Sequence, residues 1–314
     1  VDGDRFTVVR QRETVAQQRR GAGLRPQHQL QLRRRQRPEL IRQQPQSRQP
    51  HPQQRGPVKA ARRTHRFRVC RIRARASAEA VAARNAKAEN ERLRDCVNIL
   101  VKHVHAAIKE MEPSQEEWFK TIMFLTETGH TCDDWRQEFI LLSDIMGVSM
   151  LVDAINNRKP SGASESTVLG PFHVAEAPEL PMGSNICLDG KGEPMLVRGR
   201  ILDTDGNAVA GAKIDVWQAN DEGFYDVQQK GLQPDFNLRG VFRTGADGQY
   251  WFKAIKPKFY PIPDDGPVGQ LLGKLGRHPF RPAHFHYLIT LDGYQKLTTH
   301  IFDPDDQYIN SDAV

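Results

Sequence analysis

Two histidines and two tyrosines in this 314-residue sequence have the chemistry of transition-metal ligands. His284 and His286 are separated by one residue inside an aromatic and β-branched stretch, so both imidazoles should lie on one face of a β-strand. Neutral imidazole is the commonest protein ligand for transition metals. Tyr225 and Tyr260 lie upstream in turn-like surroundings, within Gly-Phe-Tyr-Asp and Phe-Tyr-Pro-Ile-Pro. A His-x-His pair is as often a packed or solvated pair as a metal site, and either tyrosine alone could be a core aromatic, so the candidate site depends on all four residues together.

The same residues carry a resemblance to a known family. Gly-Phe-Tyr ending at Tyr225, Tyr-Pro-Ile-Pro starting at Tyr260, Gly-Arg-His-Pro starting at Gly276 and Arg-Pro-Ala-His-Phe-His starting at Arg281 are similar to motifs of the intradiol ring-cleaving dioxygenases. The resemblance is strongest to the hydroxyquinol and chlorocatechol 1,2-dioxygenases, and it extends over about three quarters of the chain. It implies that the two tyrosines and the two histidines bind non-haem Fe(III).

The resemblance also assigns catalytic roles near the metal. It implies that Tyr260 leaves the metal when a catechol binds, and that its freed phenolate accepts a substrate proton. It implies that Arg281, which stays protonated, stabilises negative charge developing on the ring, whereas without the resemblance a surface arginine would be the plain interpretation. His300 stands where many plain catechol dioxygenases carry glutamine, which favours the hydroxyquinol and chlorocatechol branch. A strand histidine bonded to a neighbour is the alternative for His300.

Substrate choice is expected to depend on residues that match pocket positions of the family. Asp144 is the most informative of them, because a carboxylate in the pocket wall could accept a hydrogen bond from a third ring hydroxyl and so favour hydroxyquinol over a chlorinated ring. A solvated helix residue is the alternative for Asp144. The expected pocket residues are Leu141, Asp144, Val168, Leu169, Gly170, Pro171, Ile262 and Pro263.

Charge is distributed unevenly along the chain. Residues 1–75 hold 21 Lys+Arg against 4 Asp+Glu, a balance of +17, and the remaining residues hold 24 against 34, a balance of −10, which together give the net +7. The four cysteines are widely spaced without a C-x-x-C pattern, which indicates free thiols in a reducing compartment. No apolar run approaches the ~18 residues of a membrane span, and the start lacks a signal-peptide pattern. We therefore expect a soluble, cytoplasmic protein that does not associate with membranes.

Residues 1–76 differ in composition from the rest of the chain. They are rich in Arg, Gln and Pro, poor in aliphatic residues and without sustained periodicity, so we expect them to be disordered. Clustered arginines could form a nucleic-acid-binding arm. A solvated tail or a wrongly assigned start of translation is the favoured interpretation, because the family carries no such arm and the sequence has no initiator methionine. We therefore expect no nucleic-acid partner.

Residues 77–166 form the expected helical domain, with a helical pattern from about Ser77 to Asn157 and a loop after it. Apolar residues recur at helical spacing from Leu93 to Ile108, and again around Trp118 and Phe139, which predicts amphipathic helices whose apolar stripes lie in a core. The resemblance implies that this region is a linker domain through which such enzymes form homodimers, often around bound phospholipid.

Residues 167–314 have the pattern of short strands separated by Gly and Asp turns, which predicts an antiparallel β-sandwich. Three hairpins are expected, which pair residues 197–202 with 213–218, 240–244 with 249–253, and 284–291 with 296–302. The expected fold is α+β, with a helical N-terminal dimerisation domain followed by a β-sandwich catalytic domain. Because the family typically continues for some tens of residues past Val314, we expect the catalytic domain to be truncated at its C-terminus.

The resemblance implies an enzyme that cleaves hydroxyquinol (1,2,4-trihydroxybenzene) in the intradiol position with O2 at Fe(III), giving maleylacetate in the breakdown of aromatic compounds. Chlorocatechol or catechol, giving chloromuconate or cis,cis-muconate, is the alternative substrate. Two interpretations of other classes stay open. One is a non-catalytic β-sandwich binding module without a metal, and the other is a nucleic-acid-binding protein that acts through residues 1–75.

Overall fold

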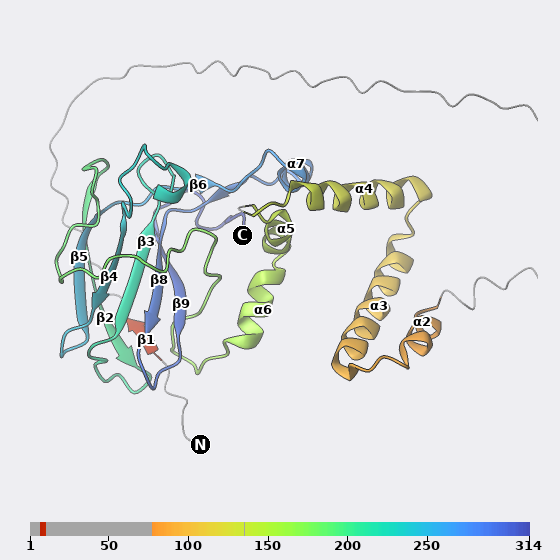
Figure 1. Cartoon of the computed structure of the whole chain (residues 1–314), viewed down its shortest axis with the longest axis horizontal. Coiled ribbons are helices and arrows are strands. Elements are labelled where there is room, and N and C mark those ends of the chain that lie inside the picture. The colour runs from red at the N-terminus through yellow and green to blue at the C-terminus, as the bar shows by residue number, and fades with distance from the viewer. Residues whose placement is uncertain (1–6, 11–76, 135) are drawn as a thin grey trace, which may run out of the picture. The chain divides into compact units, whose positions relative to one another are not determined.

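The structure, a computed structural model, describes residues 7–10, 77–134 and 136–314. The chain divides into two compact units, Arg19–Ser114 and Gln115–Val314, and the second also includes the segment Val1–Gln18. The described part of the first unit is helical, and the second contains helices and antiparallel strands (Figure 1). The α+β class predicted from the sequence is therefore confirmed.

Helices α2 (Ala78–Asn85) and α3 (Glu91–Met111) form the described part of the first unit. Ser77 caps α2 and Asn90 caps α3, since each side chain accepts a hydrogen bond from the backbone N–H three residues further along. Such caps satisfy N–H groups that have no partner within the first turn of a helix. The local sequence therefore fixes where both helices begin.

The apolar stripe of α3 is exposed, which contradicts its predicted place in a core. Leu93, Leu100 and Ile108 keep 59%, 62% and 43% of their surface accessible. Trp118 and Phe139, further along the chain, are also exposed. Neither α2 nor α3 contains a buried residue, and the contact between these two helices leaves the apolar stripe of α3 exposed. Helical spacing identifies an apolar face, but it does not identify what covers that face.

The second unit has helices before and within its β region, namely α4 (Gln115–Thr131), α5 (Glu138–Ile145), α6 (Val148–Asn156) and α7 (Pro267–Lys274). The fully buried Glu138 carboxylate joins α5 to α7, because it accepts hydrogen bonds from Val268 N at 3.1 Å and from Arg136 Nε at 2.9 Å. None of the helices in the described ranges has the length and hydropathy needed to cross a membrane.

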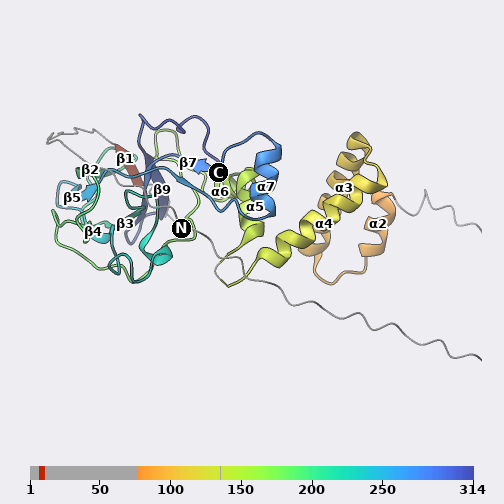
Figure 2. The same cartoon turned by 90° about the horizontal axis from the view of Figure 1, so that it is seen from above.

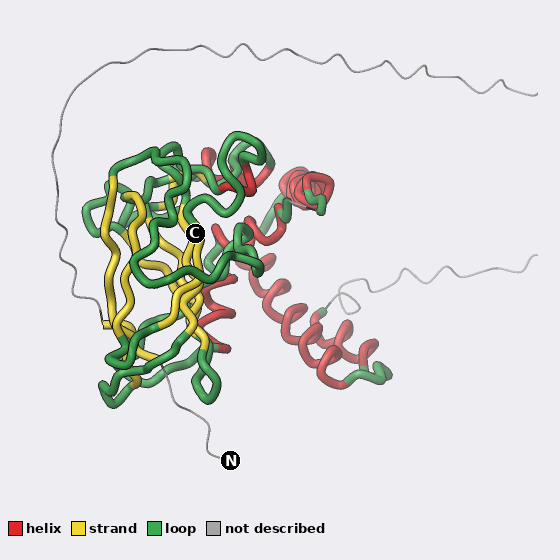
Figure 3. Tube along the Cα trace, turned by 60° about the vertical axis from the view of Figure 1, so that its left-hand side comes forward, coloured by secondary structure: helices red, strands yellow, loops and turns green. Residues whose placement is uncertain are grey.

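Two larger antiparallel sheets form the β-sandwich (Figure 1, Figure 2). The three-stranded sheet has the order β1-β2-β5, formed by Thr7–Arg10, Pro194–Asp203 and Gln249–Ile255. The four-stranded sheet has the order β4-β3-β8-β9, formed by Arg239–Arg243, Lys213–Gln218, His284–Thr290 and Leu297–Phe302. A two-stranded ribbon pairs β6 (Tyr260–Pro261) with β7 (Phe280–Arg281). Figure 3 shows these strands running alongside one another, with loops at both ends.

Two of the three predicted hairpins are wrong, and the third, β8 with β9, is confirmed. The strands β2 and β3 lie in different sheets, as do β4 and β5. Each connection crosses the sandwich, so that residues of both strands enter one core, among them Ile201 and Phe252 from one sheet and Ile214 and Phe242 from the other. Gly248 (φ +75°) allows the second crossing to pack closely, since a Cβ there would lie 2.5 Å from Ile201 O.

The strand β1 lies within the segment that was expected to be disordered. It pairs antiparallel with β2, with Thr7 opposite Asp203 and Val9 opposite Ile201. The sequence Thr-Val-Val is rich in β-branched residues, which favour strands. Residues 1–6 and 11–76, on which the rest of that expectation falls, lie outside the described residues.

Candidate active site

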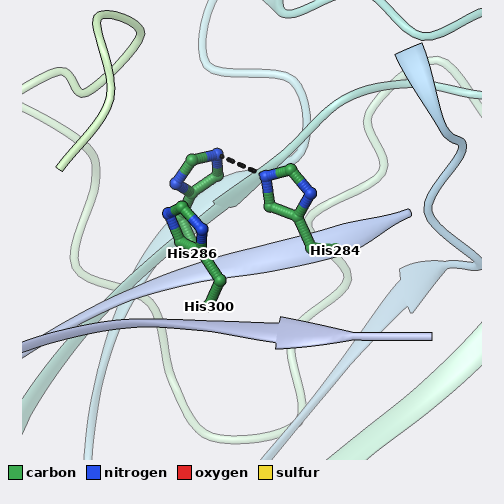
Figure 4. Close-up of side chains that lie close together, drawn as sticks. All are labelled: His284, His286 and His300. Carbon is green, nitrogen blue, oxygen red and sulfur yellow. Dashed lines mark hydrogen bonds between the residues drawn. The ribbon is translucent and has the colours of Figure 1, made fainter. Parts of the chain in front are cut away.

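The strand β8 places His284 and His286 on one face, as their spacing predicts. Each side chain is 2% exposed, and their Nε2 atoms lie 3.2 Å apart (Figure 4). His284 Nδ1 lies 2.7 Å from Pro282 O, so Nδ1–H donates to this carbonyl and the Nε2 lone pair is directed toward His286. Hydrogen bonds of this kind select the tautomer of metal-binding histidines.

Tyr225 reaches the histidines from a tight loop. The Asn220 side chain closes this loop by accepting hydrogen bonds from the backbone N–H groups of Glu222 and Phe224, at 3.0 and 2.9 Å. The Tyr225 hydroxyl lies 2.8 Å from His286 Nε2. Burial raises the pKa of Tyr225 well above its ordinary value, with the neighbouring phenol of Tyr260 adding to the effect. A cation at this position would act in the opposite direction and favour the phenolate.

Tyr260 completes the group from the ribbon of β6 and β7. It pairs with Arg281 across this ribbon and is 7% exposed. Its hydroxyl lies 3.2 Å from that of Tyr225. The phenol oxygens of Tyr225 and Tyr260 and the Nε2 atoms of His284 and His286 are therefore brought together from a loop, a ribbon and a sheet strand.

These four atoms form a donor set that suits a transition-metal ion. Burial lowers the pKa of His284 to about 3, with the Arg281 charge adding to the effect, and it lowers the pKa of His286 well below its ordinary value. Both imidazoles are therefore neutral and offer lone pairs. Ligand atoms bound about 2.1 Å from one ion, at right angles to each other, lie about 3 Å apart. The contacts of 2.8, 3.2 and 3.2 Å among the four atoms match that spacing.

A buried ion pair anchors the residue that follows Tyr225. Arg239 Nε donates to Asp226 Oδ1 at 2.7 Å, and Asp226 Oδ2 accepts from Phe236 N at 3.0 Å. Both charged side chains are less than a tenth exposed. The loop that contacts Asp226 is strained, because Phe236 and Leu238 have φ values of +61° and +59°, which side chains rarely adopt. Such strain persists only where surrounding contacts enforce it, so the loop holds Asp226 firmly beside Tyr225.

Arg281 is buried and held by a carboxylate. Its Nε and one terminal nitrogen donate to the two oxygens of Asp312, at 3.1 and 3.0 Å. Burial opposes the charge of this guanidinium, but the neighbouring Tyr260 and Asp312 outweigh burial and raise the pKa of Arg281 above its ordinary value. A permanent positive charge therefore lies beside the tyrosines.

His300 joins the histidines from the neighbouring strand. It lies directly opposite His286 in the β8–β9 pair, with ring centroids 4.2 Å apart, and 4.7 Å from the ring of His284 (Figure 4). Burial lowers the pKa of His300 well below its ordinary value, with the neighbouring His284 and the positive charge of Arg281 adding to the effect. The possible ligand atoms of the three imidazoles lie within 4.8 Å of one another. His300, which was not predicted to be a ligand, is thus close to the donor set.

A cavity of about 600 Å³ adjoins Arg281 and His300. Its remaining lining residues come from α6, the loop after it, β9 and the last residues of the chain: Met150, Ser164, Glu165, Ser166, Thr167, Thr299, Ile301, Phe302, Asp312 and Val314. The lining combines hydroxyl, carboxylate and apolar groups with one guanidinium, which suits a small aromatic molecule with several hydroxyls.

None of the eight predicted pocket residues belongs to the cavity lining. Ile262 is buried with Ile145 in an apolar cluster, against which Leu141 packs. Asp144 is half-buried, and the positive charge of Arg281 acts on it. A Cβ added at Gly170 would lie 3.3 Å from His286 Cε1. The others are Val168, which is half-buried beside His300, and Leu169, Pro171 and Pro263, which are exposed. Their part in substrate choice stays a prediction.

Sequence reasoning missed several residues that support the site. Phe172 stacks on Tyr225 with ring centroids 4.5 Å apart, and Trp217 stacks on His286 at 4.7 Å. Asp226 directly follows Tyr225, and this position next to a predicted ligand was the one sequence signal that could have identified Asp226. Nothing in the sequence connects Asp312 to Arg281, which lies 31 residues earlier.

Comparison with known proteins identifies similar chains over most of the described region. Residues 90–164 match a family model described as catechol dioxygenase N terminus, and residues 170–314 match one described as dioxygenase. A curated relative named Hydroxyquinol 1,2-dioxygenase, from Rhizobium sp. (strain MTP-10005), is 71% identical over 238 residues, which cover 76% of this chain and 81% of the relative.

Two further relatives agree with these matches. A protein named 6-chlorohydroxyquinol 1,2-dioxygenase, from Cupriavidus pinatubonensis (strain JMP 134 / LMG 1197), is 49% identical over 236 residues, which cover 75% of this chain and 85% of the relative. The solved structure of hydroxyquinol 1,2-dioxygenase from Pseudomonas putida DLL-E4 has a TM-score of 0.74 and 47% identity, over 76% of this chain and 82% of that chain.

Proposed function

The chain belongs to the catechol dioxygenase family of intradiol ring-cleaving enzymes, and we propose that it cleaves hydroxyquinol with O2 to give maleylacetate in the breakdown of aromatic compounds. The 71% identical relative named Hydroxyquinol 1,2-dioxygenase supports this substrate. The structural observation that carries the proposal is the convergence of two phenol oxygens and two neutral imidazole nitrogens at 2.8–3.2 Å.

The proposed cofactor is Fe(III), held by Tyr225, Tyr260, His284 and His286. Fe(III) is a hard cation that favours anionic oxygen ligands, and two phenolates with two neutral imidazoles leave a net charge of +1. When bound, Fe(III) would supply a Lewis acid that orients the two adjacent substrate hydroxyls and draws electron density from the ring. The neutral state of both buried imidazoles supports this assignment.

Three side chains have proposed roles in the reaction. Tyr260, as the phenolate, would accept one proton from a substrate hydroxyl and become a neutral phenol, while Tyr225 stays fixed by its loop. The Arg281 guanidinium, held by Asp312, stabilises negative charge as it develops on the ring, because it stays protonated in a buried place. His300, opposite His286, borders both the donor set and the cavity. It is placed to donate or accept a hydrogen bond at the ring.

Asp144 is the residue that we propose to bind the third substrate hydroxyl. Asp144 is half-buried, and Arg281 is a cation near it. Burial raises the pKa of the Asp144 carboxyl, whereas the hydrogen bond with Ser149 and the charge of Arg281 act to lower it. A carboxylate there accepts a hydrogen bond from the hydroxyl that catechol lacks. Selectivity for hydroxyquinol would follow, because this half-buried acceptor loses a hydrogen bond when the substrate has no third hydroxyl.

The proposal includes a homodimer formed through the helical segment, with phospholipid bound there, and a cytoplasmic location. The exposed apolar stripe of α3 supports the dimer, since contiguous apolar surface of this kind commonly marks an interface. Cys96, Cys132 and Cys187 are free thiols, which supports a reducing compartment. Light scattering would measure the mass in solution, and lipid extraction followed by mass spectrometry would identify any bound phospholipid. A monomer without lipid would contradict this part of the proposal.

Oxygen uptake with a substrate panel tests the proposed function. Purified, iron-loaded protein should consume O2 with hydroxyquinol and form a product of the mass of maleylacetate. Turnover should be lower with 6-chlorohydroxyquinol, and lower again with catechol. A preference for catechol would overturn the substrate assignment, and absence of ring cleavage with every diol would overturn the proposed function.

A further inference from the structure

The two histidines of the donor set are held in different ways. His284 Nδ1 has the carbonyl of Pro282 as its partner, at 2.7 Å. His286 Nδ1 is buried and has no hydrogen-bond partner among the described residues. Metal-binding histidines almost always donate their second ring N–H to a carboxylate, carbonyl or water, which fixes the orientation of the ring. Among the described residues, no protein group orients the His286 ring through Nδ1.

Trp217 supplies a flat contact on the face of that ring. Trp217 on β3 lies directly opposite His286 on β8 in the sheet. The two rings are nearly parallel, with an angle of 9° between their planes and centroids 4.7 Å apart. Trp217 is 1% exposed and His286 is 2% exposed. An indole held against an imidazole in this way prevents the smaller ring from tilting or rotating about its χ2 bond.

Trp217 is itself held by further contacts. The ring of His173 meets the indole at an angle of 60°, with centroids 4.8 Å apart. His173 Nε2 lies 3.0 Å from Asp215 Oδ2, and Asp215 is 4% exposed on the same strand as Trp217. The indole is consequently part of a fixed array, and it can transmit that rigidity to His286.

Gly170 closes the edge of the His286 ring that carries Nδ1. A Cβ at this position would lie 3.3 Å from His286 Cε1 and 3.9 Å from Nδ1. Gly170 has φ +79°, a conformation that favours glycine. The backbone therefore approaches the ring so closely that a Cβ would push the ring by a few tenths of an ångström, and it leaves the ring little room to swing away from Trp217.

We propose that Trp217 and Gly170 are positioning residues that orient His286 by packing, in the role that a backbone hydrogen bond has for His284. This inference rests on the proposed function, in which His286 Nε2 binds the metal. It explains why one ligand can lack a hydrogen-bonded partner within a rigid site. It also assigns Trp217 a role in iron binding, which a residue that only fills the core would not have.

Iron binding by three variants tests the proposal. Iron-free wild-type protein and the variants Trp217→Leu, Trp217→Phe and Phe242→Leu would be titrated with ferric nitrilotriacetate, while the visible phenolate-to-iron absorption is recorded. Trp217→Leu removes the flat contact and should weaken iron binding about tenfold, the lower end of the effect of losing a residue that orients a ligand. Its absorption band should also shift or broaden. Trp217→Phe keeps a flat ring and should stay close to wild type.

Phe242→Leu is the matched control. Phe242 is a fully buried aromatic that stacks on Phe252 in the sandwich core, at 4.9 Å and 11°. Its replacement should lower the thermal midpoint but leave iron affinity and the absorption band unchanged. If Phe242→Leu weakens iron binding as much as Trp217→Leu does, Trp217 acts through stability alone and the proposal is overturned.

The remaining outcomes separate this inference from the proposed function. If Trp217→Leu does not fold, Gly170→Ala tests the same idea, because the added methyl group presses on the edge of the His286 ring. This variant should weaken iron binding and shift the absorption band. If the wild-type protein binds iron, and Trp217→Leu or Gly170→Ala binds iron with the same affinity, this inference alone is overturned. A wild-type protein that binds no iron would overturn the proposed function, and this inference with it.

Discussion

The Tyr225 hydroxyl lies 2.8 Å from His286 Nε2, although 61 residues separate the two in the chain. Both side chains are almost completely buried. Tyr225 comes from the loop before the short 3₁₀ helix η1 (Asp226–Gln228), and His286 comes from a central strand of the four-stranded sheet. The candidate site therefore depends on the packing of a loop against a sheet.

Replacing Tyr225 with phenylalanine should remove or shift the visible absorption of the iron-loaded protein, because a phenolate bound to Fe(III) gives a low-energy charge-transfer band. Absorption spectra and iron content of the purified variant would be measured together. Tyr250→Phe is a suitable control, since Tyr250 is a buried tyrosine of the sandwich core and packs against Phe252. An unchanged band in Tyr225→Phe would exclude Tyr225 as a ligand.

Replacing Asp144 with alanine should lower kcat/KM for hydroxyquinol by about 1.5–3 kcal/mol, the range for a hydrogen bond to a charged group. Catechol turnover should change little or rise, because catechol has no third hydroxyl to bind. Steady-state kinetics on both substrates would check this. Equal losses on both would show that Asp144 supports α5 and does not read the ring.

Replacing Asp226 with asparagine should destabilise the protein by about 3–5 kcal/mol, because the Arg239 charge would stay buried without its partner. Urea unfolding measures this difference. The exposed pair of Arg243 and Glu179, with a 2.7 Å contact, provides the comparison. Glu179→Gln should change stability little, because solvent screens an exposed pair. Similar stability of both variants would show that the buried pair is not required.

The iron-free protein should lose stability as the pH falls below about 6.5. The pKa of His284 is lowered from 6.5 to about 3 in the folded state, so the unfolded chain binds the proton first. This contribution is fully present above pH 6.5 and is lost as the pH falls toward 3, by about 1.4 kcal/mol per pH unit for each such histidine. Thermal midpoints across this range would show the slope. His284→Gln should have a shallower slope, and an equal slope would contradict the assignment.

Deleting residues 1–76 should leave iron content and turnover almost unchanged. The family match begins at residue 90, and β1 is an edge strand whose loss leaves β2 paired with β5. Oxygen uptake by the shortened and full-length proteins would be compared at equal iron content. A large loss of turnover in a folded, shortened protein would show that this segment contributes to the enzyme.

The sequence was most informative where a short pattern determines a local structure. Alternation in His-Phe-His predicted a strand with both imidazoles on one face, and β8 has that arrangement. Turn residues and strand spacing predicted the antiparallel sandwich. The pairing of strands was less predictable, because a Gly and Asp turn reverses the chain without specifying whether the next strand joins the same sheet or the opposite one.

The supporting residues of the site could not be predicted because their contacts are long-range. Asp312 and Arg281 form their ion pair only after the last residues of the chain fold back on β7. Trp217 looked like an ordinary core residue, and its stacking on His286 follows from the register of β3 against β8. Likewise, the α3 stripe had a clear helical period, but its exposure depends on which surfaces the rest of the chain provides.

The short turn between β8 and β9 has a consequence for the order in which the donor atoms gather during folding. Contacts that close short loops form sooner than those that close long ones. His284, His286 and His300 all lie on this hairpin, whereas Tyr225 comes from a separate loop and Tyr260 from the ribbon strand β6. When the complete chain folds, the three imidazoles would thus come together before either phenol joins them. Copper and zinc bind imidazole well, so these ions would compete at that early stage, and iron gains its preference only when the tyrosines dock.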